Sequence, residues 1–186
     1  MNADTAPDVV AETRAWIEKF VIGLGLCPFA AAPFNAGRVG VSVCDQDDTD
    51  GVYQAFLTAL FELFTSDPSE LETSLLVVPQ GLASFDDYLD MLEMLQLAVR
   101  EAGAEGMVQV ASFHPDYRFA DAAADDPANF TNRSPYPMFH LIREDGLAAA
   151  LESVADPDAI PARNIARLRG LGGDGIRMLL AQIKDQ

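Results

Sequence analysis

Basic residues are scarce in this sequence. It has 12 lysine and arginine residues against 29 aspartate and glutamate residues, which gives a formal net charge of −17 at pH 7. Nucleic acids and anionic membrane surfaces both bind proteins through basic patches. The charge balance therefore argues against a nucleic-acid partner and against a membrane partner. The simplest interpretation of the acidity is a well-solvated surface.

Long apolar runs and cysteine pairs are also lacking. No run approaches the roughly 20 residues of a membrane-spanning helix. The first ten residues, MNADTAPDVV, lack the basic and apolar regions of a signal peptide. Two cysteines, Cys27 and Cys44, are too few for a disulfide framework. We therefore expect a cytoplasmic protein in a reducing compartment.

An apolar content of 49% over 186 residues is enough for one domain with a substantial core. Periodicity predicts helices at about residues 8–24, 50–64, 84–102 and 145–154, two more after residue 158, and strands at residues 38–44, 73–78, 107–113 and 138–143. Strands that alternate with helices favour a parallel sheet. The fourth strand has no helix before it, so we expect it to run antiparallel to one of the others.

The predicted fold is a layered α/β or α+β domain that spans residues 1–186. It has a four-stranded mixed sheet flanked by helices, a long loop between the third and fourth strands, and a helical tail, residues 157–186, packed on it. Side chains of Asp50, Ser84 and Asp145 are expected to cap helices. Residues 25–37 are expected to be irregular. The motif GLGGDG in the tail matches a dinucleotide-binding pattern by letter, but it follows a helix and is expected to break the tail in two.

Residues 113–144 hold most of the side chains suited to chemistry, including both histidines of the protein. The connection within this segment exceeds the roughly 12–15 residues beyond which a loop is commonly functional or disordered. Its ends combine aromatic residues with prolines, which favours packing. Its centre, ADAAADDPAN, is acidic and has small side chains. We expect ordered ends and a mobile centre.

His114 directly follows a predicted strand, where open α/β sheets bind their ligands. An imidazole next to Asp116 is a candidate general acid or base, with Asp116 to orient it. The alternative is a turn histidine bonded to its own loop. His140 shares a strand face with Met138 and Ile142, which is more typical of a core histidine. If the fourth strand pairs with the third, the two histidines could approach each other. No recognised metal-binding spacing is present, so no metal ligand is assigned.

The block TNRSPYP, residues 131–137, has a specific shape. Its polar side chains can order the backbone, and its two prolines fix the entry to the fourth strand. This would present Arg133 as a two-pronged donor to a carboxylate or phosphate. The alternative is an internal bridge from Arg133 to a loop aspartate. The residues expected to bind the ligand are Tyr117, Asn132, Arg133, Tyr136 and His140.

Four blocks carry a resemblance to a known family: GLCPFA, FHPDYRFAD, DDPANFTNRSPYPMFHLIRE and RNIARLRGLG. They resemble a bacterial family that is catalogued as a domain of unknown function and numbered fourteen-fifteen. The resemblance extends over nearly the whole chain and is most specific in HPDY and TNRSPYP. It implies a single domain and assigns no catalytic role.

Two functions stay open at the level of sequence. One is a small-molecule pocket built from residues 113–144, in which Arg133 holds an anionic group and the pair His114 and Asp116 provides any catalysis. The other is a non-catalytic interaction module whose long loop binds a protein. Thiol chemistry at Cys27 is a weaker idea, because a buried structural thiol is the simpler interpretation. Whether the protein is an enzyme stays open, and its cofactors are unknown.

Overall fold

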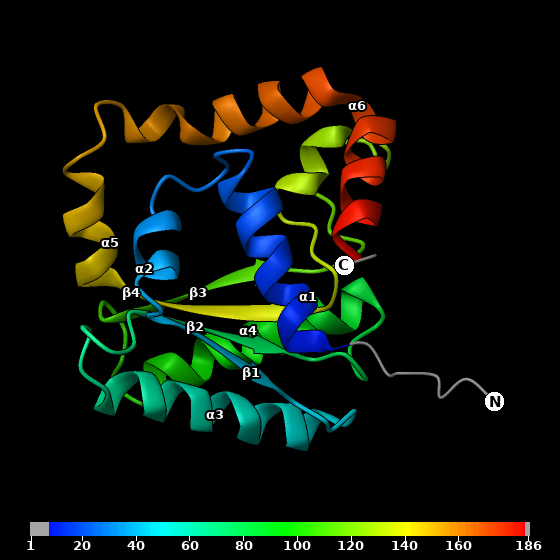
Figure 1. The fold of residues 1–186 in the computed structure, drawn as a ribbon. Helices are drawn as coiled ribbons and strands as arrows, with labels where there is room; N and C mark the ends of the chain where they lie inside the picture. The colour runs from blue at the N-terminus through cyan, green and yellow to red at the C-terminus, as the bar shows by residue number, and fades with distance from the viewer. Residues whose placement is uncertain (1–7, 185–186) are drawn as a thin grey trace.

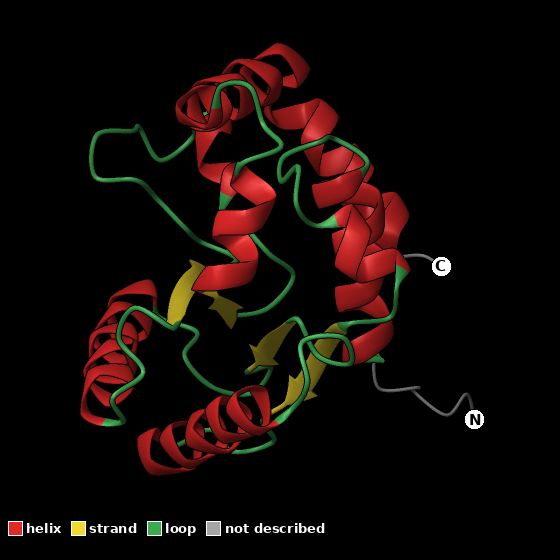
Figure 2. Ribbon diagram, turned by 90° about the vertical axis from the view of Figure 1, so that its left-hand side faces the viewer, coloured by secondary structure: helices red, strands yellow, loops and turns green. Residues whose placement is uncertain are grey.

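The computed structural model describes residues 8–184, in which a four-stranded sheet lies between two groups of helices (Figures 1 and 2). The strands are β1 (Val39–Val43), β2 (Thr73–Val77), β3 (Val108–Phe113) and β4 (Met138–Arg143). The α-helices are α1 (Val9–Trp16), α2 (Ala31–Asn35), α3 (Thr49–Thr65), α4 (Phe85–Glu101), α5 (Glu144–Leu151) and α6 (Ile160–Lys184). A π-helix, η1 (Ile17–Ile22), and two 3₁₀-helices, η2 (Pro127–Thr131) and η3 (Pro157–Ala159), complete the set. Within these residues no helix is both long and apolar enough to cross a lipid bilayer.

The strand order is β1-β2-β4-β3, and the predicted four-stranded mixed sheet is confirmed. Strands β1 and β2 are parallel, while β4 runs antiparallel to both β2 and β3. The chain reaches β4 without a crossover helix, so β4 inserts between its two neighbours in the reversed direction. This central position explains why Met138, Phe139 and Leu141 are fully buried.

Alternation along the strands divides the core in two. On one side Leu76, Phe139 and Leu141 pack against α3 and α4, and we call this side the α3/α4 face. On the other side Leu75 and Met138 pack against α1, η1 and α6, together with residues of the long loop, and we call this side the α1/α6 face. Figure 1 shows α1 and α6 above the sheet and α3 below it.

The predicted cap of α4 is confirmed, because Ser84 Oγ accepts a hydrogen bond from the backbone N–H of Asp87 at 3.3 Å. The predicted cap of α3 was wrong by two residues. Asp48, with an extended backbone, accepts from Gly51 N at 2.8 Å, so Asp50 lies inside the helix. Several acidic residues precede this helix, and a cap is decided by which of them has an extended backbone.

The predicted cap of α5 was also wrong. The helix begins at Glu144, directly after β4, and the cap position is Arg143, without a side-chain cap bond. The guanidinium of Arg143 reaches the C-terminal end of α3 instead, where it donates to the carbonyl of Ser66 at 2.8 Å and to that of Leu63. A helix can begin in this way because β4 positions the preceding backbone.

The first predicted helix is not α-helical throughout. It changes to π-helix at Ile17, which adds residues to each turn and rotates the following side chains. A 3.6-residue pattern cannot show this change. The segment 25–37, expected to be irregular, contains the short helix α2. Its proline, Pro33, lies in the first turn, where its missing N–H breaks no helical hydrogen bond.

The helical tail is broken within GLGGDG, as predicted. Gly172 has φ 70° and ψ 158°, a conformation that is restricted to glycine, so α6 consists of two helical halves. The first half passes over η2, and the second half lies close to α1 (Figure 1). This bend brings the C-terminal half of α6 to the long loop.

Candidate functional site

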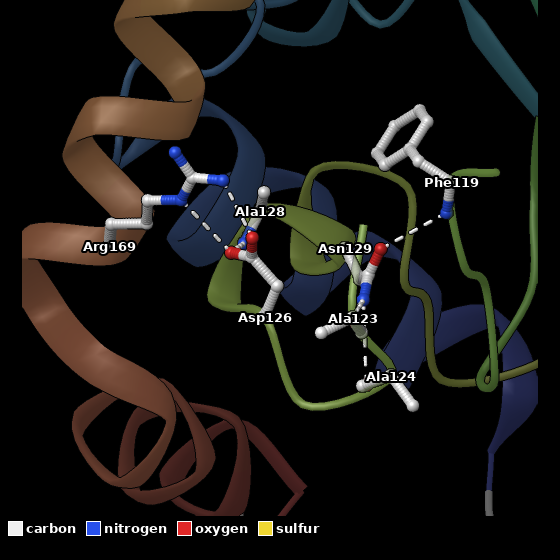
Figure 3. A network of polar contacts seen from close by, with 7 residues as sticks. All are labelled: Phe119, Ala123, Ala124, Asp126, Ala128, Asn129 and Arg169. Atoms are coloured by element: carbon white, nitrogen blue, oxygen red, sulfur yellow. Dashed lines mark hydrogen bonds and ion pairs between the residues drawn. The ribbon is translucent and has the colours of Figure 1, made fainter. Parts of the chain in front are cut away.

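The acidic centre of the long loop, which we expected to be mobile, makes specific contacts (Figure 3). Asn129 is fully buried. Its Oδ1 accepts from Phe119 N at 3.0 Å, and its Nδ2 donates to Ala123 O at 2.8 Å. Asp126 receives two hydrogen bonds from Arg169 of α6, at 3.1 and 2.6 Å. Arg169 and the N–H of Ala128 lower the pKa of Asp126 to about 2. The loop centre is therefore tied both to itself and to α6.

His114 is only 1% exposed and both of its ring nitrogens have partners. Nδ1 accepts from the backbone N–H of Asp116 at 3.0 Å, so Nε2 carries the proton and donates to the carbonyl of Leu82 at 2.9 Å. The ring lies against Phe85 and Tyr88, with centroid distances of 5.3 and 5.1 Å. Asp116 contacts the imidazole through its backbone, while its side chain is exposed. This geometry is that of a turn histidine.

His140 lies on the opposite side of the sheet from His114. Strand β4 does pair with β3, and His140 is opposite Ala111. The His140 ring, however, faces Phe113 on the α1/α6 face, whereas His114 packs against α4. Thr73 Oγ1 donates to Leu141 O at 2.7 Å, so His140 Nε2 donates to that hydroxyl, at 2.6 Å. Burial lowers the pKa of His140 to about 4, which keeps the ring neutral at pH 7.

Tyr117 and Asn132 hold the ends of the long loop together. Asn132 Nδ2 donates to Ser112 O at 2.9 Å, and the backbone carbonyl of Asn132 accepts from His114 N at 3.1 Å. Ser112 Oγ donates to the hydroxyl of Tyr117 at 3.4 Å, and the Tyr117 ring packs against Phe85 with a centroid distance of 5.1 Å. These contacts order the base of the loop on the α3/α4 side.

Arg133 is partly buried and is held by backbone carbonyls. Nε donates to Tyr117 O at 3.0 Å and Nη2 donates to Ala124 O at 2.9 Å, while the guanidinium lies 4.7 Å from the centroid of the Phe130 ring. Its Nη1 has no hydrogen-bond partner within residues 8–184. The sequence left open a bridge to a loop aspartate; within residues 8–184 Arg133 forms no ion pair, although the charge of Asp116 acts on its guanidinium. Arg133 therefore supports the loop and keeps one donor group free.

A hollow of about 300 Å³ opens beside Arg133, between α1, the long loop and the C-terminal half of α6. We call it the arginine hollow, because Arg133 and Arg177 both line it. The other lining residues are Glu12, Trp16, Pro115, Phe130, Ser134, Pro135, Leu180, Ala181 and Ile183. Most of this wall is apolar, and its polar groups are few.

A second hollow of about 350 Å³ lies on the other side of Arg133. It is more polar than the first and is lined by Ser84, Phe85, Asp86, Asp116, Arg118, Ala124 and Arg133. Two carboxylates face two guanidinium groups there, so its charges compensate one another. Of the residues predicted from sequence, only Asp116 and Arg133 line either hollow, while Tyr136 reaches the arginine hollow indirectly, through Glu12.

The arginine hollow has donors that lack acceptors. Among the described residues Arg177 pairs only with Asp174, at 2.7 Å, and both side chains are highly exposed, at 64% and 96%. Such exposed pairs contribute little stability. The Nε1–H of Trp16 is buried and has no acceptor among the described residues. Burial lowers the pKa of Arg133, the charge of Asp116 opposes this shift, and the charge of Arg177 adds to it, although a guanidinium stays charged at neutral pH.

Sequence reasoning missed three side chains of this hollow that could bind polar groups of a ligand, from Glu12, Trp16 and Arg177. Trp16 is one of several apolar residues that recur at helical spacing in the first helix, a pattern that predicts a core residue and not a site. Arg177 belongs to a run of arginines that is typical of a solvated helix face. Glu12 reaches the long loop by accepting a hydrogen bond from Tyr136, 124 positions away, at 2.5 Å. Burial and Glu12 together raise the pKa of the Tyr136 hydroxyl.

Other sites are not indicated. Within residues 8–184, no group of three or more histidine, cysteine, aspartate and glutamate side chains could hold a metal ion. Cys27 is partly buried, and burial raises the pKa of its thiol, which disfavours the reactive thiolate.

The comparison with known families agrees with the resemblance seen in the sequence blocks. The sequence model of one family, described as "Protein of unknown function (DUF1415)", matches residues 8–178. No curated protein and no solved structure matches the chain. The matched range includes the long loop and both arginines of the hollow. The chain therefore belongs to the DUF1415 family of proteins of unknown function.

Proposed function

We propose that the protein binds a small organic anion, with a carboxylate or phosphate group, in the arginine hollow. The observation that carries this proposal is that Arg133 and Arg177 line one hollow and that, among the described residues, neither forms an ion pair with Glu12, the carboxylate that also lines it. Two guanidinium groups in a partly desolvated site repel each other unless an anion lies between them. A bound anion would remove this repulsion and accept charge-assisted hydrogen bonds.

Arg133 is already held in position for this role. Its bonds to the carbonyls of Tyr117 and Ala124 fix the plane of the guanidinium and leave Nη1 free. A fixed donor loses little conformational entropy when the ligand binds. Arg177 lines the same hollow from α6, and its exposed partner Asp174 competes only weakly for it.

The size and lining of the hollow restrict the ligand. A volume of about 300 Å³ is at the lower end of the roughly 300–1,000 Å³ of small-molecule sites. Apolar side chains such as Phe130, Leu180 and Ile183 make up much of the wall. These features fit a small molecule with an anionic end and an apolar part. They do not fit an inorganic anion, which would leave the apolar wall uncovered.

Binding, and not catalysis, is the activity proposed. An acid–base role for His114 remains a prediction that requires its ring to leave the partners of both nitrogens. The bonding of the long loop weakens the alternative of a protein-interaction module. The long loop has its polar groups bonded within the chain, as with Asn129 and Asp126.

The test is a thermal-shift screen of carboxylates and phosphate esters that carry aliphatic or aromatic groups. A ligand at 100 times its dissociation constant should stabilise the protein by about 2.7 kcal/mol. Arg177→Gln should weaken binding of any hit by about 1.5–3 kcal/mol, because it removes a charged hydrogen-bond donor. Arg100→Gln is the matched control, since it removes one exposed positive charge at the end of α4.

Two results would contradict the proposal. One is a screen in which no organic anion raises the melting temperature. The other is a hit that both substitutions weaken equally, since that pattern would reflect net charge alone. Arg133→Lys is the less suitable variant, because Arg133 also supports the long loop and its loss would lower stability directly.

A further inference from the structure

Glu12 is a carboxylate in the arginine hollow that neither arginine neutralises. Its Oε2 accepts from the hydroxyl of Tyr136 at 2.5 Å. Its Oε1 has no hydrogen-bond partner among the described residues, and Glu12 forms no ion pair with Arg133 or Arg177. Opposite charges thus share one hollow but are held apart from each other. The Tyr136 hydroxyl fixes the carboxylate on the α1 side of this space.

Charges that are separated across a partly apolar hollow require partners from the ligand. An anionic group can bind the two arginines, and a cationic or donor group can bind Glu12 at the same time. We propose that the ligand of the arginine hollow is a zwitterion, an α-amino acid with an apolar side chain. This inference rests on the proposed function and names the ligand class for the same site.

Each group of such a ligand has a counterpart in the hollow. The α-carboxylate would bind Arg133 Nη1 and Arg177, and the Nε1–H of Trp16, buried without an acceptor, is a third candidate donor. The α-ammonium group would bind Glu12. The apolar side chain would lie against Phe130 and the apolar residues of α6.

The same arrangement disfavours the other small anions. A dicarboxylate or a phosphate ester with a second negative group would bring that charge towards Glu12. A simple fatty acid would leave Glu12 without a cation. An amine without a carboxylate would leave the arginines unpaired. The two arginines alone would accept any of these anions. Glu12 therefore acts as the residue that selects the amino acid among them.

The experiment compares compounds that share one carbon skeleton. Isothermal titration calorimetry with the full chain at pH 7 measures phenylalanine, 3-phenylpropionate and phenethylamine. A second series uses leucine, 4-methylpentanoate and 3-methylbutylamine, so that the result does not depend on one side-chain shape. We expect at least one amino acid to bind tenfold or more tightly than both of its partial analogues.

Two variants assign the preference to Glu12. Glu12→Gln keeps an acceptor for Tyr136 and removes the charge, so the amino acid should lose its advantage over the matched carboxylate. Glu18→Gln is the control, because Glu18 is exposed on η1 and does not line the hollow. Tyr136→Phe leaves the Glu12 charge in place, so the preference for the amino acid should persist there.

The outcomes separate this inference from the proposed function. If a simple carboxylate binds as tightly as its amino acid, the zwitterion proposal is overturned while anion binding stands. If no compound with a carboxylate binds in either series, the zwitterion proposal is overturned, and the thermal-shift screen with its phosphate esters decides anion binding separately. If Glu12→Gln leaves the amino-acid preference unchanged, Glu12 is not the selecting residue and the inference is wrong. Should that variant not fold, the two compound series on the unaltered chain decide alone.

Discussion

The two faces of the sheet satisfy their buried polar groups differently. On the α3/α4 face the hydroxyl of Tyr88 donates to Met138 O at 2.8 Å and accepts from Phe113 N at 2.9 Å, and His114 has partners for both nitrogens. The buried side-chain atoms without a partner in the described residues are Thr13 Oγ1, Trp16 Nε1 and Thr131 Oγ1. Their residues belong to α1 and η2, which cover the α1/α6 face.

The backbone shows the same contrast. Both helices of the α3/α4 face are regular, 17 residues long and capped by a side chain, Asp48 or Ser84. On the α1/α6 face the first helix changes to π-helix at Ile17, and α6 breaks at Gly172. Departures from regular packing collect at functional sites, because a ligand there supplies contacts that the chain lacks. The difference fits the proposal that the α1/α6 face holds a binding site, while the α3/α4 face serves stability.

The largest effect is expected from His114→Ala, which tests the structural role of the α3/α4 side. It removes two hydrogen bonds and a buried ring, so we expect a loss of about 3–4 kcal/mol in the free energy of unfolding. Urea denaturation measures this loss. The folded fraction should bind a ligand of the arginine hollow as before. A loss below about 1 kcal/mol, the scale of a surface substitution, would contradict the structural role and favour an accessible acid or base.

Much of this fold can be predicted from the sequence. The apolar run at Thr73–Val77 and the pattern of β4 locate the central strands, and Ser84 is a correct cap. The absence of a helix before β4 correctly gives its antiparallel direction. These features depend on local patterns, in which a few neighbouring residues determine the structure.

The arginine hollow cannot be predicted in the same way. It brings together Glu12, Arg133 and Arg177, which come from the start, the middle and the end of the chain. Their meeting depends on the bend at Gly172 and on the position of the long loop, neither of which follows from periodicity. Arg133 was found because its block has a local shape. The partners proposed for it, His114 and His140, were on the wrong side of the loop or deep in the sheet, because β-strand alternation sends neighbouring residues to opposite faces.

A change of pH tests whether His140 is held neutral on the α1/α6 face. Its pKa is about 4 in the folded chain against an ordinary 6.5, so the unfolded chain binds the proton first as the pH falls. The free energy of unfolding should therefore decrease as the pH falls from 6.5 to 4. Below pH 4 both states carry the proton, so His140 should cause no further decrease. The shift corresponds to at most about 3 kcal/mol, and to less in solution, because the small exposed part of the His140 side chain lets water solvate the protonated ring.

His140→Gln keeps a donor for Thr73 and removes the titrating group. Urea denaturation at several pH values should show a shallower loss of stability in this variant over that window. Parallel curves for the two proteins would mean that the ring takes up its proton in the folded state as easily as in water.

The bend of α6 is tested by two glycine substitutions. Gly172→Ala places a Cβ at φ 70° and ψ 158°, which should lower stability by about 1–3 kcal/mol. Gly170→Ala is the control, because this residue is helical and has open space around its Cβ, so it should gain up to about 1 kcal/mol. Thermal melts measure both. Equal effects of the two substitutions would mean that the bend at Gly172 is not a fixed feature.

The smallest effect is expected from Thr13→Val, and it tests the contrast between the faces most directly. Thr13 is fully buried and its Oγ1 has no partner in the described residues, so valine removes an unsatisfied hydroxyl and keeps the shape. We expect a gain of about 1 kcal/mol in stability, the lower end of the cost of burying such a group. Thr73→Val is the matched control, because the hydroxyl of Thr73 has two partners and its removal should lower stability by about 1–2 kcal/mol. A gain in stability from Thr13→Val together with a loss from Thr73→Val would support the idea that unsatisfied polar groups around the hollow lower the stability of the α1/α6 face. A loss from Thr13→Val similar to that from Thr73→Val would mean that Thr13 is satisfied in solution, and the contrast would then rest on Trp16 and Thr131.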